Sequence, residues 1–87
     1  MIFRSEPFKV RMTGRAGIVY EEGPRSMEID SEMLAGPDFD IVIYTESIKR
    51  WRPPHESEAI TDDVKSRIKA NLAESLPRLR IDWQERG

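Results

Sequence analysis

The sequence predicts an α+β fold, a small antiparallel sheet of about five strands with one C-terminal helix packed on one face. Several short segments alternate apolar and polar residues with a period of two, which is typical of half-buried strands. One later segment repeats apolar residues every four positions, as one face of a helix does. The chain has 87 residues, which is the size of one domain, so we expect residues 1–87 to fold as a single α+β domain.

Three strands are predicted first, in residues 8–13, 18–21 and 26–30. Each of these segments alternates apolar with polar or outward-facing side chains. Residues 14–17 contain two glycines and residues 23–24 are Gly-Pro. Glycine reaches positive φ without steric cost, so both segments predict tight turns. Links this short imply antiparallel neighbours.

The next connection is ambiguous, and it is followed by the clearest strand. Residues 31–37 fit either a short helical turn, begun by Asp30 or Ser31 and ended by Gly36-Pro37, or an irregular connection. Residues 41–45 are β-branched or aromatic, apolar toward both faces and preceded by turn residues. We expect this segment to be the central strand, covered by the helix on one side.

The C-terminal third predicts a long loop, a helix and a last strand. Residues 47–58 predict an ordered loop, because its two prolines cannot donate ladder hydrogen bonds. Thr61 is a suitable N-cap, and the two aspartates after it favour the positive end of a helix macrodipole. Pro77 ends the helix, and residues 79–84 alternate again. The position of this last strand in the sheet is left open. The apolar stripe of the helix is Val64, Ile68, Leu72 and Leu76.

Composition limits the classes of function. The chain has 14 basic and 16 acidic residues, a formal charge of −2, and this balance argues against nucleic acid as a partner. There is no cysteine, which excludes disulfides and thiolate catalysis. The N-terminal residues lack the apolar run of a signal peptide, and the longest apolar run, Ile41 to Tyr44, is far shorter than the about 20 residues of a membrane span. We therefore expect a cytoplasmic protein with no membrane partner.

Candidate catalytic and metal-binding groups are few. His55 is the only histidine. It could act as a general base or metal ligand beside Glu56 or Glu58, but the spacing matches no zinc motif, and a solvated loop histidine is the favoured interpretation. The aspartate pairs at 38/40 and 62/63 lie at a turn and at a helix start, without a calcium-loop pattern. We expect no catalytic residue, no metal site and no cofactor, and thus no enzyme.

The segment after Arg50 is the candidate partner-binding site. Tryptophan and arginine are enriched among binding hot spots, and a rigid proline segment loses little entropy on binding. Alternatively, the tryptophan pins the loop onto the protein's own core. Residues 49–52 could also stack a nucleobase and contact phosphate, but nearby carboxylates would weaken that attraction. The predicted partner-binding residues are Trp51, Arg52, Pro53, Pro54, His55 and Glu56.

A group of acidic residues gives a second, weaker indication of binding. If these residues share one side of the predicted hairpins, they would suit a basic partner; they would equally suit an ordinary solvated face. The residues are Glu21, Glu22, Glu28, Asp30 and Glu32.

Four segments carry a resemblance to a known family: Ser31-Glu32-Met33-Leu34, residues 38–44, residues 47–51 and Pro53-Pro54-His55-Glu56. With the helix start at Thr61 and the closing strand, the chain from about residue 17 to residue 83 resembles the immunity protein 74 family of bacterial polymorphic-toxin systems. The resemblance implies an antidote in the cytosol that binds and blocks a cognate toxin domain encoded beside it, without enzyme activity or cofactor. It carries over no toxin-contacting residue. The alternative is a small non-enzymatic protein-binding or regulatory module.

Overall fold

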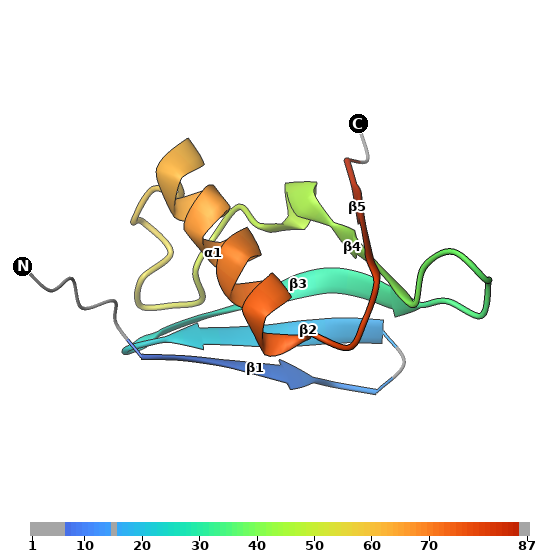
Figure 1. Cartoon of the computed structure of the whole chain (residues 1–87). Coiled ribbons are helices and arrows are strands. Elements are labelled where there is room, and N and C mark those ends of the chain that lie inside the picture. Colours follow the sequence, from blue (N-terminus) through green and yellow to red (C-terminus); the bar gives the residue numbers. More distant parts are fainter. Residues whose placement is uncertain (1–6, 15, 86–87) are drawn as a thin grey trace, which may run out of the picture.

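The computed structural model describes residues 7–14 and 16–85. In this part of the chain one five-stranded sheet carries one helix on one of its faces, which confirms the predicted α+β class (Figure 1). In chain order the elements are β1 (Phe8–Met12), β2 (Ala16–Glu22), β3 (Arg25–Met33), β4 (Ile41–Tyr44), the 3₁₀ turn η1 (Thr45–Ser47), α1 (Asp62–Ser75) and β5 (Ile81–Gln84).

The strands follow one another across the sheet in chain order. The first three pairings are antiparallel, as predicted, whereas β4 and β5 are parallel, so the sheet is mixed. The parallel pairing has a topological cause: the chain between β4 and β5 crosses the face of the sheet through α1 and returns to the same end.

The expectation that residues 41–45 form the central strand is wrong. β3 lies at the centre and β4 lies fourth, next to the edge strand β5. β4 is nonetheless buried toward both faces: Ile41 and Ile43 face the helix, and Val42, on the opposite face, is only 5% exposed. An apolar strand sequence therefore indicates that both faces of the strand are covered, but it does not indicate the position of the strand in the sheet.

The structure of residues 31–33 decides between the two alternatives predicted for residues 31–37. They continue β3 and pair with β4 in the register Ser31↔Ile43, Glu32↔Val42 and Met33↔Ile41. The helical-turn alternative is therefore wrong, because these residues are extended and take their place in the sheet ladder. Residues 34–40 form the loop of the hairpin that joins β3 to β4.

The core lies between the sheet and α1. Register places Val10 opposite Tyr20 and Tyr20 opposite Met27, so these side chains point to the helix side. A register shift between Ala16 and Ile18 marks a β-bulge. The bulge needs Gly17, whose φ is +94° and whose added Cβ would lie 2.7 Å from Thr13 Oγ1. The buried core cluster is Ile18, Tyr20, Met27, Ile29, Ile41, Ile43, Ile48, Trp51, Ile68 and Leu72.

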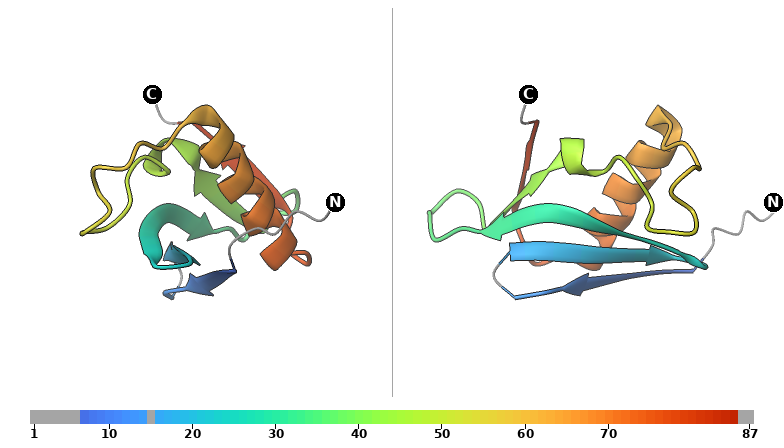
Figure 2. Two further views of the ribbon diagram at one scale, coloured as in Figure 1. Left: turned by 90° about the vertical axis from the view of Figure 1, so that its left-hand side faces the viewer. Right: turned by 180° about the vertical axis from the view of Figure 1, so that it is seen from behind.

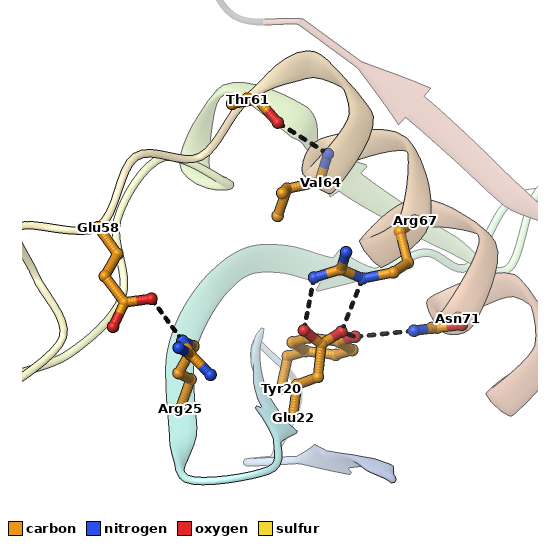
Figure 3. Close-up of polar contacts among 8 residues, drawn as sticks. All are labelled: Tyr20, Glu22, Arg25, Glu58, Thr61, Val64, Arg67 and Asn71. Atoms are coloured by element: carbon orange, nitrogen blue, oxygen red, sulfur yellow. Dashed lines mark hydrogen bonds and ion pairs between the residues drawn. The ribbon is translucent and has the colours of Figure 1, made fainter. Parts of the chain in front are cut away.

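The helix begins as predicted. The Thr61 hydroxyl accepts a hydrogen bond from the backbone N–H of Val64 at 3.2 Å (Figure 3), which confirms the N-cap. Ile68 and Leu72 are fully buried against the sheet, and Val64 and Leu76 pack partly buried at either end of this stripe. No helix among the described residues has the length and apolar character that crossing a membrane would require.

Candidate partner-binding site

Trp51 is a core residue. Its side chain is 3% exposed and its ring packs on Tyr20, with the ring centroids 6.3 Å apart and the planes at 28°. The interpretation of Trp51 as an exposed binding residue is therefore wrong, and the alternative holds: the tryptophan pins the following loop onto the core. The local sequence, a tryptophan between two arginines, is the same whether the tryptophan is exposed for binding or buried in the core. Only the packing in the folded protein distinguishes the two possibilities.

The residues after Trp51 form a projecting segment, Arg52 to Glu58, which we call the proline loop. The backbone N–H of Arg52 donates to the Ser26 carbonyl of β3 at 2.8 Å, which fixes the start of the loop. Two turns follow, in which the N–H of His55 donates to the Arg52 carbonyl at 2.9 Å and that of Glu58 donates to the His55 carbonyl at 3.0 Å. The peptide bond between its two prolines is cis.

The predicted binding residues of the proline loop differ in exposure. Arg52, Pro53, Pro54 and Glu56 are exposed, and His55 is half-buried. The loop thus brings five of the six predicted residues together on one projection and removes the tryptophan from it. Figure 2 shows the loop standing away from the sheet at the end opposite the β3–β4 hairpin.

Ion pairs hold both ends of the proline loop. Arg52 Nη2 lies 3.1 Å from Glu28 Oε2, and Arg25 Nε donates to Glu58 Oε1 at 2.6 Å (Figure 3). Both partner residues belong to the β3 strand, which therefore acts as the base of the loop. A segment held in this way loses little conformational entropy when it binds a partner.

A polar network, buried at Tyr20 and Glu22, joins α1 to β2 (Figure 3). Arg67 donates twice to the carboxylate of Glu22, from Nη2 to Oε1 at 2.6 Å and from Nε to Oε2 at 3.1 Å. The Tyr20 hydroxyl donates to Glu22 Oε2 at 2.6 Å and accepts from Asn71 Nδ2 at 2.8 Å. Glu22 is 4% exposed, so this bidentate pairing compensates the cost of its burial.

The network keeps the phenol of Tyr20 protonated. Burial, reinforced by the hydrogen bond to Glu22, raises the pKa of Tyr20 far above its ordinary value of 10.0, so the phenol stays protonated. A neutral, buried phenol is unsuited to act as a base or nucleophile. We conclude that this network positions α1 on the sheet.

A shallow hollow of about 320 Å³ opens between the network and the proline loop. Its walls bring together two ion pairs, Arg25 with Glu58 and Arg67 with Glu22, and Trp51 also lines it. The described residues include no group of three or more histidine, aspartate or glutamate side chains placed to hold a metal ion. The chemistry available here is charge pairing and hydrogen bonding, which serve recognition. The lining residues are Glu22, Arg25, Trp51, Glu58, Ala59, Val64 and Arg67.

The group of acidic residues divides between two faces. Glu22 points inward to Arg67, which corrects the expectation that it could share a side with the other acidic residues. Its even-numbered position, in phase with Ile18 and Tyr20, was the signal that could have placed it on the helix side. The remaining carboxylates lie on the face that α1 leaves open: Glu21, Glu28, Asp30 and Glu32.

The chain matches the model of a known protein family. The model of the family described as Immunity protein 74 matches residues 9–82, nearly the whole chain. The chain belongs to the immunity protein 74 family. The match confirms the resemblance inferred from residues 17–83, and it places the proline loop, the buried network and the open sheet face within the immunity protein 74 region. No curated protein and no solved structure matches the chain.

Proposed function

We propose that this immunity protein binds a cognate toxin domain in the bacterial cytoplasm and neutralises it by covering its surface. The observation that carries the proposal is the family match over residues 9–82. The architecture supports it, because the hydrogen-bonded pairs Arg25–Glu58 and Arg67–Glu22 hold the proline loop and α1 in place. Inhibition by occupying a surface needs no reactive group on the inhibitor and is stoichiometric.

The proline loop is the proposed contact with the toxin. Its exposed residues project from the domain, while Trp51 and the two ion pairs hold it from beneath. The contact would combine apolar surface from Pro53 and Pro54 with charge from Arg52 and Glu56. A preorganised projection of this kind is suited to enter a depression on a partner.

Co-expression tests the function. The chain is produced together with the toxin domain encoded beside its gene, and bacterial growth and complex formation are measured by plating and by size-exclusion chromatography with light scattering. We expect restored growth and a one-to-one complex. A toxin that remains lethal beside abundant folded antidote contradicts the proposal, as does recovery of a housekeeping protein as the sole partner, which favours a regulatory module.

A charge reversal tests the loop. Glu56 is exposed and lies at the tip of the loop, so Glu56→Arg should leave the fold intact and weaken toxin binding at least tenfold. Glu74→Ala, at an exposed position of α1, is the control and should bind like the parent protein. Calorimetry of each variant against the toxin domain gives the dissociation constants. Equal affinity of all three proteins would exclude the loop from the interface.

A further inference from the structure

The β3–β4 hairpin exposes apolar surface. Among the described residues, the exposed large hydrophobic side chains are Met33 at 37%, Leu34 at 38% and Phe39 at 41%. Isolated exposed apolar residues are ordinary on any protein, but these three lie within one seven-residue stretch. We call residues 33–40 the hairpin tip; Figure 1 shows it projecting beyond the sheet, opposite the proline loop.

Arg80 anchors the hairpin tip to the start of β5. Its guanidinium donates to both carboxylate oxygens of Asp40, at 3.1 Å each, and to the carbonyl of Pro37 at 2.7 Å. The backbone N–H of Arg80 also donates to Asp40 Oδ2 at 2.8 Å, and its carbonyl accepts from the N–H of Asp40 at 2.9 Å. One residue thus makes contacts along the returning arm of the tip, so the apolar side chains are presented on a fixed frame.

The tip is apolar on both sides. The N–H of Leu34 donates to the carbonyl of Asp40 at 2.9 Å, so the extended pairing of β3 continues past Met33. Consecutive side chains of an extended chain point to opposite sides. Met33 and Leu34 therefore cover opposite sides of the tip, and a flat partner surface would bury only one of them. A groove or pocket would bury both.

The negative charge around the hairpin tip favours one kind of binding partner over the others. Glu32 and Asp38 are exposed beside the apolar residues, and Asp30 continues the negative surface along β3; Glu28, farther along the strand, is paired with Arg52. These carboxylates, apart from Asp38, line an open hollow of about 400 Å³ next to the tip. A second copy of this chain, paired about a two-fold axis through the tip, would bring like charges together, and an anionic membrane would repel them. A basic protein surface would attract them.

We infer that the hairpin tip is a protein-docking element that inserts into an apolar groove rimmed by lysine or arginine on the partner. The inference rests on the proposed function, because that partner is taken to be the toxin domain. The inference adds a second contact with the toxin domain, at the end of the domain opposite the proline loop. This contact is mainly apolar, whereas the contact through the proline loop combines prolines with charged side chains.

The test truncates the apolar side chains and leaves the anchor intact. Leu34→Ala/Phe39→Ala should weaken binding to the toxin domain at least tenfold in calorimetry, because buried aromatic and aliphatic anchors carry much of the affinity of an interface. Asp38→Lys keeps both apolar residues and should also weaken binding, since it opposes the basic rim. Glu74→Ala on α1 is again the control. Circular dichroism verifies the fold of each variant.

The outcomes separate this inference from the proposed function. If the parent protein binds the toxin domain and both tip variants bind as tightly as the control, the tip is not a contact and the inference is overturned while the proposed function stands. If the parent protein does not bind the toxin domain, both are overturned. If the parent protein is a dimer by light scattering and Leu34→Ala/Phe39→Ala is a monomer, the tip is a self-interface and the inference is overturned.

Discussion

The proline loop and the hairpin tip are two short projections that differ in whether their large apolar side chains are buried or exposed. Trp51, immediately before the loop, is buried in the core, and the loop itself presents prolines and charged side chains. The tip leaves Leu34 and Phe39 exposed and uses Asp40 for its attachment. Exposure therefore does not follow residue type; it follows whether neighbouring elements supply a surface on which the side chain can pack.

The two projections share the strand β3. Glu28, in the middle of β3, pairs with the proline loop, and Met33, at its end, begins the hairpin tip. Nine extended residues span about 30 Å. Figures 1 and 2 accordingly show the two projections at opposite ends of the sheet. The carboxylates on the open face of β3 lie between them, so a single basic partner would have to cover that face to reach both.

The largest expected contrast is in stability. Trp51→Ala should lower the free energy of unfolding by about 3–5 kcal/mol, because it removes a buried aromatic side chain and leaves a cavity. Phe39→Ala, which removes a ring that is 41% exposed, should lower it by less than about 1 kcal/mol. Urea unfolding followed by circular dichroism measures both. Comparable losses in the two variants would contradict the difference in burial between the projections.

An arginine that pairs with a buried carboxylate should matter more for stability than an exposed arginine. Arg67→Ala leaves the carboxylate of Glu22 buried without its bidentate partner and should cost about 2–3 kcal/mol of unfolding free energy, below the full value for a buried pair because Arg67 itself is half exposed. Arg78→Ala, at an exposed position, should change stability by less than about 0.5 kcal/mol. Chemical denaturation of the two variants side by side gives the difference. A cost for Arg67→Ala no greater than that for Arg78→Ala would show that Glu22 does not need its partner.

The smallest expected effect is the pH dependence of the hairpin tip. The hydrogen bonds from Arg80 hold the pKa of Asp40 below its ordinary value of 3.8. Because the folded pKa is depressed, this pair stabilises the tip above about pH 4, and the contribution disappears as the pH falls through the folded pKa. Asp40→Asn should therefore melt at a lower temperature than the parent protein at pH 7. The two melting temperatures should converge near pH 2, and a gap of equal size at both pH values would exclude the ion pair as its cause.

Much of the secondary structure was predictable because it depends on neighbouring residues. The alternation in residues 8–13 and 26–30 predicted β1 and most of β3, and the four-residue spacing predicted the buried stripe of α1. The Thr61 cap was likewise predictable, since it requires only a hydroxyl three residues before the donor N–H. Long, periodic segments specify their own buried side through the period alone.

The candidate site was predictable only as a segment of chain. The two prolines predicted a loop over residues 47–58, but the pairing of Glu58 with Arg25 joins residues 33 positions apart. The exposure of Phe39 was not predictable, because a single aromatic residue between two aspartates is typical of a turn that leads into a strand. It depends on the tertiary structure, in which the contact between Arg80 and Asp40 holds the hairpin tip away from the core.

The sequence by itself determined the existence and type of most strands and of the helix, and the apolar side of most of them, because steric and hydrophobic preferences act over a few positions. The tertiary structure alone decided the parallel placement of β5, the burial of Trp51, the inward turn of Glu22 and the exposure of Leu34 and Phe39. The physical reason is that burial is a relation between distant segments: an apolar side chain needs a cover, and only the path of the whole chain determines whether another element arrives to provide it.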